Sequence, residues 1–190
     1  MLFNLQFLKF WFKASNSKGH GTHSPFVYDF IMNVLNDDRV FYCFKELEQA
    51  RKKYADNELC NAKKVDELLF RMVDYYQLKN VVAINSNAIT QLYLNNTNAA
   101  ISNELQREQK DLIFIDTAIS QDLSIDEIIE ACKPKSFIII NKNNTHQHQQ
   151  KLWQHLVADK RIDTTIDLYH LGIAVINPDF KVKQHFNIRY

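Results

Sequence analysis

Short aliphatic runs recur through the second half of the chain, and each is separated from the next by a polar or helix-like stretch. They are Val81–Ile84, Ala99–Ser102, Leu112–Ile115 and Phe137–Ile140. Continuous apolar runs that alternate with helices are typical of a mostly parallel sheet covered on both faces. This pattern predicts an α/β fold.

The stretch Lys79–Leu94 is the clearest single unit in this pattern. Its aliphatic run leads through the small and polar residues Asn85 to Ala88 into a helix-like segment. A buried strand, a tight turn and a helix bind nucleotide-like ligands when the turn is rich in glycine. This turn contains no glycine, and the chain has only three among its 190 residues. Because glycine lets a backbone approach a ligand closely, the chain offers little for cradling a cofactor.

The first part of the chain predicts helices throughout. Ser24 can cap a helix with Pro25 at its first position, and the region from Val65 to Tyr76 carries the clearest apolar stripe at helical spacing. We expect a helical N-terminal extension over residues 1–76, packed on a shortened α/β core over residues 77–190. No repeat or low-complexity linker separates the two parts, so we expect one folding unit.

The C-terminal part predicts two helices and further strands. Ser124 begins a helix with a capping-box pattern, continued by an apolar stripe to Cys132, and Thr145 is placed to cap a later helix. The segments Thr164–Tyr169 and Leu171–Ile176 lie too close together for a crossover helix. They therefore either pair antiparallel or do not pair directly. The closing residues 185–190 are suited to an edge strand.

Charge and cysteine content exclude several classes of function. The net charge of +1 gives no long-range field that would attract nucleic acid. Three cysteines without a CxxC spacing argue against a disulfide framework and favour a reducing compartment, the cytoplasm.

The N-terminal sequence MLFNLQFLKFWFK is aromatic and apolar but is interrupted by polar and basic residues. It is too short to span a bilayer and has no small-residue cleavage site. Residues 1–13 fit an interfacial helix at a membrane surface, with Phe3, Phe7, Phe10 and Trp11 among the headgroups. They also fit a helix packed on its own domain or on a second subunit.

The segment Lys18–Asp37, KGHGTHSPFVYDFIMNVLND, resembles the opening of a bacterial family of class I, S-adenosylmethionine-dependent O-methyltransferase-like proteins with an HGxHSPFVY signature. The resemblance continues in ELLFRMVDYYQLKN (Glu67–Asn80), in DLIFID (Asp111–Asp116) and in the closing TTIDLYHLGIAV and HFNIRY. It implies a Rossmann-like class I methyltransferase fold with an antiparallel strand at its C-terminal end.

This chain departs from the family pattern where the family binds its cofactor. The family has an acidic residue near the end of the first strand and glycines in the next turn, where this chain has Ala83, Asn85 and Ala88. The side chain of Ala83 cannot accept a hydrogen bond. Asparagine tolerates a positive φ but brings a side chain with it.

The sheet is also expected to have fewer strands than the family. The interval from Asn95 to Lys110 is too short for a strand, a helix and a further strand. Ala99–Ser102 fits the second strand, and Glu104 then lies either near the position of the cofactor ribose or in a solvated loop.

Two further departures concern the next strands. The family continues its aspartate motif with a glycine and a histidine, whereas Asp116 is followed by Thr-Ala-Ile. Asp116 either contacts a ligand at the carboxyl end of its strand or caps the following turn. The family then has two aspartates where this chain has Asn141 and Lys142. The anionic oxygens suited to a divalent metal or to proton abstraction are therefore missing.

Other polar groups favour structural roles. His146 and His148 are two residues apart and face different sides of a helix, so these two and His155 fit a solvated face better than a metal site. His20 and His23 either dock the N-terminal helices or border the former active site. The run Arg51-Lys52-Lys53 fits an ordinary helix exterior.

The leading interpretation is a methyltransferase-like protein that has lost catalysis and S-adenosylmethionine binding and is retained as a scaffold, a homodimer or a partner-binding protein. It has no catalytic and no metal-binding residues, and Asn85, Ser86, Ala88 and Asp116 are its vestigial cofactor positions. One alternative is an active methyltransferase for an unknown small molecule, which binds S-adenosylmethionine at a rebuilt site that includes Asn141. The other is a peripheral membrane or partner-binding protein that acts through residues 1–13.

Overall fold

The structure, a computed structural model, describes residues 5–14, 23–54, 60–105, 109–116, 124–142 and 147–190. The helices in these ranges are α1 (Leu5–Lys13), α2 (Pro25–Phe30), its continuation η1 (Ile31–Leu35), α3 (Tyr42–Tyr54), α4 (Lys63–Tyr75), α5 (Ala88–Asn95), α6 (Ile125–Glu130) and α7 (Gln147–Ala158). The strands are β1 (Asn80–Ile84), β2 (Ala100–Ser102), β3 (Lys110–Ile115), β4 (Cys132–Asn141), β5 (Thr164–Asp167), β6 (Leu171–Ile176) and β7 (Gln184–Asn187).

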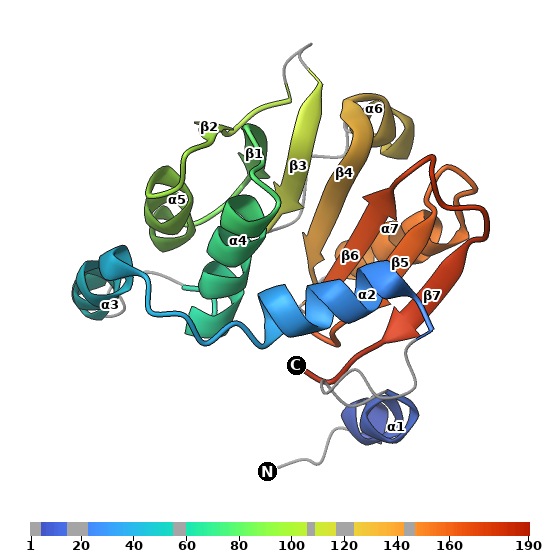
Figure 1. The fold of residues 1–190 in the computed structure, drawn as a ribbon, viewed down its shortest axis with the longest axis horizontal. Coiled ribbons are helices and arrows are strands. Elements are labelled where there is room, and N and C mark those ends of the chain that lie inside the picture. Colours follow the sequence, from blue (N-terminus) through green and yellow to red (C-terminus); the bar gives the residue numbers. More distant parts are fainter. Residues whose placement is uncertain (1–4, 15–22, 55–59, 106–108, 117–123, 143–146) are drawn as a thin grey trace.

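The described strands form one seven-stranded sheet in the order β2-β1-β3-β4-β6-β5-β7 (Figure 1). Strands β2, β1, β3 and β4 run parallel, whereas β6 runs antiparallel to both β4 and β5. Strand β7 joins the far edge parallel to β5. The predicted α/β fold, mostly parallel with an antiparallel strand near the C-terminus and helices before the sheet, is confirmed.

Alternation along the central strands gives the sheet one apolar cluster on each of its two faces. Leu112 and Phe114 of β3 point to one face of the sheet, where they pack with α2, η1 and α4. Ile113 and Ile115 of the same strand point to the other face, where they pack with α6 and α7. Because both faces are covered, the stretches Leu112–Ile115 of β3 and Phe137–Ile140 of β4 are apolar at every position and not at every second one.

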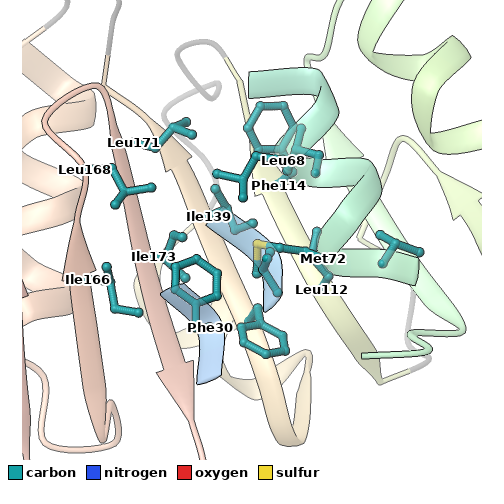
Figure 2. Packing of buried hydrophobic residues seen from close by; sticks show 14 of the residues in the cluster. Phe30, Leu68, Met72, Leu112, Phe114, Ile139, Ile166, Leu168, Leu171 and Ile173 are labelled. Atoms are coloured by element: carbon teal, nitrogen blue, oxygen red, sulfur yellow. The ribbon is translucent and has the colours of Figure 1, made fainter. Parts of the chain in front are cut away.

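Figure 2 shows the first of these clusters from close by. Phe30 of α2 and Met72 of α4 lie against the strands, and both side chains are fully buried. The strand residues labelled in the same cluster are Leu112, Phe114, Ile139, Ile166, Leu171 and Ile173. The N-terminal helices therefore share one apolar core with the sheet.

The predicted helix caps of the described residues are confirmed. The Ser24 hydroxyl accepts a hydrogen bond from the Val27 N–H at 3.4 Å, and Pro25 is the first residue of α2. Ser124 and Glu127 form both hydrogen bonds of a capping box at the start of α6. The proposed cap at Thr145 lies outside the described residues.

Cys132 does not belong to α6, and the prediction that it continues the apolar stripe of that helix is wrong. α6 ends at Glu130, and Cys132 opens β4, where it pairs with Lys110 of β3. The Cys132 thiol still donates a hydrogen bond to the Ile128 carbonyl at 3.3 Å. Sheet pairing therefore begins within two residues of the helix end.

The sheet ends at β2 on one side. Only residues 103–109 separate β2 from β3, too few for a helix and another strand. At the C-terminal end, β5 and β6 pair antiparallel, which is one of the two arrangements that their close spacing allowed, and β7 is the predicted edge strand.

Helix α1 lies at the periphery of the molecule, apart from the two helical layers (Figure 1). Phe7 and Phe10 pack on Tyr169, with ring centroids 4.9 and 5.3 Å apart. The Arg189 Nε donates a hydrogen bond to the Trp11 carbonyl at 2.9 Å. One face of α1 thus rests on its own domain. Within the described part of the chain, no helix combines the length and the apolar character needed to cross a membrane.

Replacing Gly172 of β6 with alanine is expected to destabilise the fold. The added Cβ would come within 2.5 Å of Trp153 Cε3, and the Trp153 indole is held by a hydrogen bond to Asp167. We expect the free energy of unfolding, measured by urea denaturation, to fall by about 1–3 kcal/mol through overpacking. The control, Val182→Ala, changes a side chain that is 69% exposed and should cost less than about 0.5 kcal/mol. Equal stability of Gly172→Ala and wild type would contradict this packing.

Candidate functional site

The carboxyl ends of β1, β3 and β4 meet at one edge of the sheet, the edge at which open α/β sheets bind their ligands. Each of these strands ends at or near a polar side chain. Asn87 caps α5 after β1, Asp116 directly follows β3, and Asn141 is the last residue of β4. Asn61, just before α4, reaches the same place. We call these four residues the asparagine–aspartate cluster.

The carboxylate of Asp116 lies at the centre of this cluster. Its two oxygens accept hydrogen bonds from Asn61 Nδ2, each at 3.0 Å, and Oδ1 also accepts one from Asn141 Nδ2 at 2.7 Å. Oδ2 accepts bonds from the Asn87 backbone N–H at 3.3 Å and from Asn87 Nδ2 at 3.2 Å. Asp116 and Asn141 are each only 2% exposed. A buried carboxylate is thus bound by amide groups of the chain itself.

A second buried carboxylate, Asp66 of α4, is connected to the cluster. Asn61 Nδ2 donates to Thr90 Oγ1 at 3.0 Å, and Thr90 Oγ1 donates to Asp66 Oδ1 at 2.6 Å. Arg51 of α3 donates to the Asp66 carboxylate and, at 2.7 Å, to the Asn61 carbonyl. These bonds tie α3, α4 and α5 to the edge of the sheet.

Arg51 therefore does not belong to an ordinary helix exterior, and this prediction is wrong for one of the three basic residues. Lys52 and Lys53 are exposed as expected, whereas the Arg51 side chain is only 14% exposed. Burial raises the pKa of Asp66 to about 6, while the bonds from Thr90 and the charge of Arg51 act in the opposite direction. The effect of desolvation on the pKa of Asp66 is thus larger than the opposite effect of its hydrogen bonds and of Arg51.

The turn after β1 keeps the backbone shape of a glycine turn without glycine. Asn85 has a φ of 50° and is exposed. Ser86 Oγ donates to the Ala83 carbonyl at 3.2 Å and accepts a hydrogen bond from Gln91. Asparagine is among the few residues that adopt this conformation readily, which explains how the turn persists.

The N-terminus of α5 is capped from within the chain. Ala88 is its first residue, and the preceding Asn87 accepts a hydrogen bond from the Thr90 N–H at 3.0 Å. Of the four predicted cofactor positions, Asp116 lies within the asparagine–aspartate cluster. Asn85, Ser86 and Ala88 lie in and after the adjoining turn.

Lys142 points away from this cluster. Its Nζ donates to Asp167 Oδ1 at 2.7 Å and lies 5.2 Å from the centroid of the Trp153 ring, and Trp153 Nε1 donates to Asp167 Oδ2 at 3.1 Å. Burial lowers the pKa of the Lys142 ammonium group, and Asp167 opposes this shift. The position at which the resembled family has its second aspartate thus holds a buried cation with its own carboxylate partner.

The remaining candidates lie elsewhere. Glu104 is exposed after β2, and His148 and His155 are exposed on α7. His23 is exposed before α2, whereas His20 and His146 fall outside the described residues. Among the residues that the structure describes, no group of three or more His, Cys, Asp or Glu side chains is placed to hold a metal ion.

The sequence did not predict several residues that are hydrogen-bonded to Asp116 or Asp66: Asn61, Asn87, Thr90 and Gln149, together with Asp66 itself. Gln149 Nε2 donates a hydrogen bond to the Asp116 carbonyl at 2.8 Å. The role of Asp66 could have been predicted, because a carboxylate beside the most regular apolar stripe of the chain is expected to be buried and to need a partner. The role of Asn61 could not, since an asparagine before a helix is ordinary in any loop.

Solved structures of O-methyltransferases superpose on this chain. A protein from Staphylococcus aureus described as a caffeoyl-CoA O-methyltransferase matches with a TM-score of 0.50 and 16% identity, over 69% of this chain and 92% of its own. The O-methyltransferase from Bacillus cereus in complex with SAH matches with a TM-score of 0.49 and 14% identity, over 74% of this chain and 93% of its own. The O-methyltransferase TomG from Streptomyces achromogenes, in complex with SAM, matches with a TM-score of 0.49 and 10% identity, over 80% of this chain and 95% of its own.

This chain has the fold of an O-methyltransferase. At identities this low the likeness to the Staphylococcus aureus protein extends to the fold alone. No protein-family model matches the chain, and no curated protein sequence matches it.

Replacing Asp116 with asparagine is expected to destabilise the protein. Three asparagine side chains now donate to the carboxylate, and an amide in its place would turn one acceptor atom into a donor. We expect the free energy of unfolding to fall by about 1.5–3 kcal/mol, the range for hydrogen bonds to a charged group. Urea denaturation would measure this, with the exposed Asp179→Asn as the control. A gain in stability would instead mark Asp116 as a strained residue held for a ligand.

The stability of the wild type is expected to depend on pH through Asp66. The folded state holds a proton on this carboxyl up to about pH 6, whereas the unfolded chain releases it near its ordinary pKa of 3.8. This group therefore favours folding below that ordinary value, and the benefit is lost as the pH rises through about 6. Relative to Asp66→Asn, which cannot titrate, the wild type should gain stability as the pH falls from about 7 to about 4.5. Urea denaturation across this range measures the difference, and a pH-independent difference would contradict the assigned pKa.

Proposed function

We propose that this chain is a methyltransferase-like protein that has lost S-adenosylmethionine binding and methyl transfer and now acts as a scaffold or interaction protein. The observation that carries the proposal is the state of Asp116. Its carboxylate is buried and already accepts hydrogen bonds from Asn61, Asn87 and Asn141. A cofactor that used this carboxylate would first have to displace amide groups of the chain, and each displaced donor would need a new partner.

The surrounding turn does not fit S-adenosylmethionine either. The cofactor presents an ammonium group and ribose hydroxyls, which require acceptor atoms. Ala83 contributes only a buried methyl group at the end of β1, and Asn85 adds a side chain where a glycine would leave room. The helix terminus that could receive the cofactor carboxylate is capped by Asn87.

The end of β4 does not fit a catalytic metal or base. Asn141 supplies an amide that is bonded to Asp116, and Lys142 supplies an ammonium ion that is bonded to Asp167. A divalent cation prefers carboxylate oxygens, and a buried ammonium ion nearby would repel it.

A scaffold role is supported by the core and by parts of the surface. Both apolar clusters are complete around the sheet, so the fold persists where the ligand positions have changed. Large apolar side chains are exposed at the start of α3, with Val40 just before the helix at 91% and Tyr42, its first residue, at 100%, which suits contact with a protein partner or a second copy. Cys43, Cys60 and Cys132 are free thiols, in keeping with a role in the cytoplasm.

Isothermal titration of the full chain with S-adenosylmethionine tests the proposal. We expect no saturable heat, because the internal amide groups already bind the Asp116 carboxylate. The Bacillus cereus O-methyltransferase, whose structure contains SAH, serves as the positive control under the same conditions. Saturable binding near one molecule per chain would overturn the loss of the cofactor site.

The second candidate is an active methyltransferase with a rebuilt site. It is favoured by the φ of Asn85, which keeps the shape of the turn, and by the position of Asp116 and Asn141 at the same edge of the sheet. Methyl transfer depends largely on proximity and orientation, so a missing base does not exclude it. The same titration separates the two candidates. If binding is seen, Asp116→Asn should weaken it by about tenfold or more, since a buried charge-assisted bond is lost.

A further inference from the structure

Helix α1 carries more apolar side chains than its contacts with the domain use. Residues in a helix follow one another at about 100°, so Phe7, Phe10 and Ala14 share the face that rests on the domain. Phe12 lies on a different face and is 80% exposed. Leu8 lies beside Phe12 on that face and is partly exposed. This second apolar face, Leu8 and Phe12, points to solvent with the exposed edge of Trp11 beside it.

Basic side chains border this apolar face. Lys9 and Lys13 are both exposed, and the helical angle places them next to each other on the side of Phe12 away from Trp11. α1 contains no acidic residue. The cleft between α1 and the domain is lined by Lys64 and Arg189 and, among the described residues, by no acidic side chain.

We propose that α1 attaches the protein to an anionic phospholipid surface. Leu8, Phe12 and the edge of Trp11 would enter the headgroup region, while Lys9 and Lys13 would lie beside the lipid phosphates. An exposed aromatic face with flanking lysines is the pattern of helices that lie in the plane of a membrane interface. Because α1 lies at the periphery, outside both helical layers, a flat surface can approach it without meeting the sheet (Figure 1).

The charges argue for lipid and against a second copy of this chain. In a symmetric dimer through α1, the same patch of both subunits would meet, so Lys9 and Lys13 of both copies would be gathered at one interface. No acidic side chain of α1 could neutralise them. An anionic lipid surface supplies the missing negative charge and also accepts the apolar side chains.

Vesicle co-sedimentation of the full chain tests this proposal independently of cofactor binding. We expect binding to phosphatidylcholine vesicles that contain phosphatidylserine, little binding to phosphatidylcholine alone, and a loss of binding at high salt. Phe12→Ser, and separately the double variant Lys9→Gln with Lys13→Gln, should each weaken binding by about tenfold or more. Val182→Ser serves as the matched control, because it removes another exposed apolar side chain, 69% exposed against 80% for Phe12, outside α1 and should change nothing.

Four results would overturn the proposal. They are no binding to phosphatidylserine vesicles, equal binding to both vesicle types, binding by Phe12→Ser that equals that of Val182→Ser, and a dimer in sedimentation equilibrium that Phe12→Ser converts to a monomer. The last would assign the surface to a second copy. Circular dichroism checks that each variant is folded, which we expect because the changed side chains are exposed.

Discussion

Burial of both faces of the central strands is the constraint on which the rest of the structure depends. Side chains alternate along a strand, so an uninterrupted run such as Ile113-Phe114-Ile115 must bury one set on each side of the sheet. Two helical layers are then required. α2, η1 and α4 complete one core, and α6 and α7 complete the other. The helices before the sheet are thus part of the packing that holds the sheet together.

The same burial decides what happens at the carboxyl edge of the sheet. Pairing is favoured for polar groups enclosed there, because an unpaired buried donor or acceptor costs as much as a lost hydrogen bond. In a ligand-binding sheet the ligand supplies part of that pairing. Here Asn61 reaches in from the residues before α4, and Asn87 and Asn141 turn toward Asp116. The amide groups of the chain thus supply hydrogen bonds to the Asp116 carboxylate.

The polar contacts that the sequence failed to predict join residues that lie far apart in the chain. Helix caps at Ser24 and Ser124 involve residues three apart, so they could be recognised locally. Arg51 looks like any basic residue of a helix exterior, and only the fold places it against Asp66, fifteen residues further on. Asn61 bonds to Asp116 and Asn141 across 55 and 80 residues. Pairing at such separations leaves no pattern in the local sequence.

The sequence by itself determined the α/β class, the parallel centre of the sheet and the glycine-free turn at Asn85–Ala88. Each depends on apolar periodicity, turn chemistry or spacing, which act over a few residues. Only the tertiary structure decided that the Asp116 carboxylate is bound from within and that one face of α1 is covered while another is left open. Those outcomes depend on which distant side chains share a buried space, and that is set by packing the whole chain.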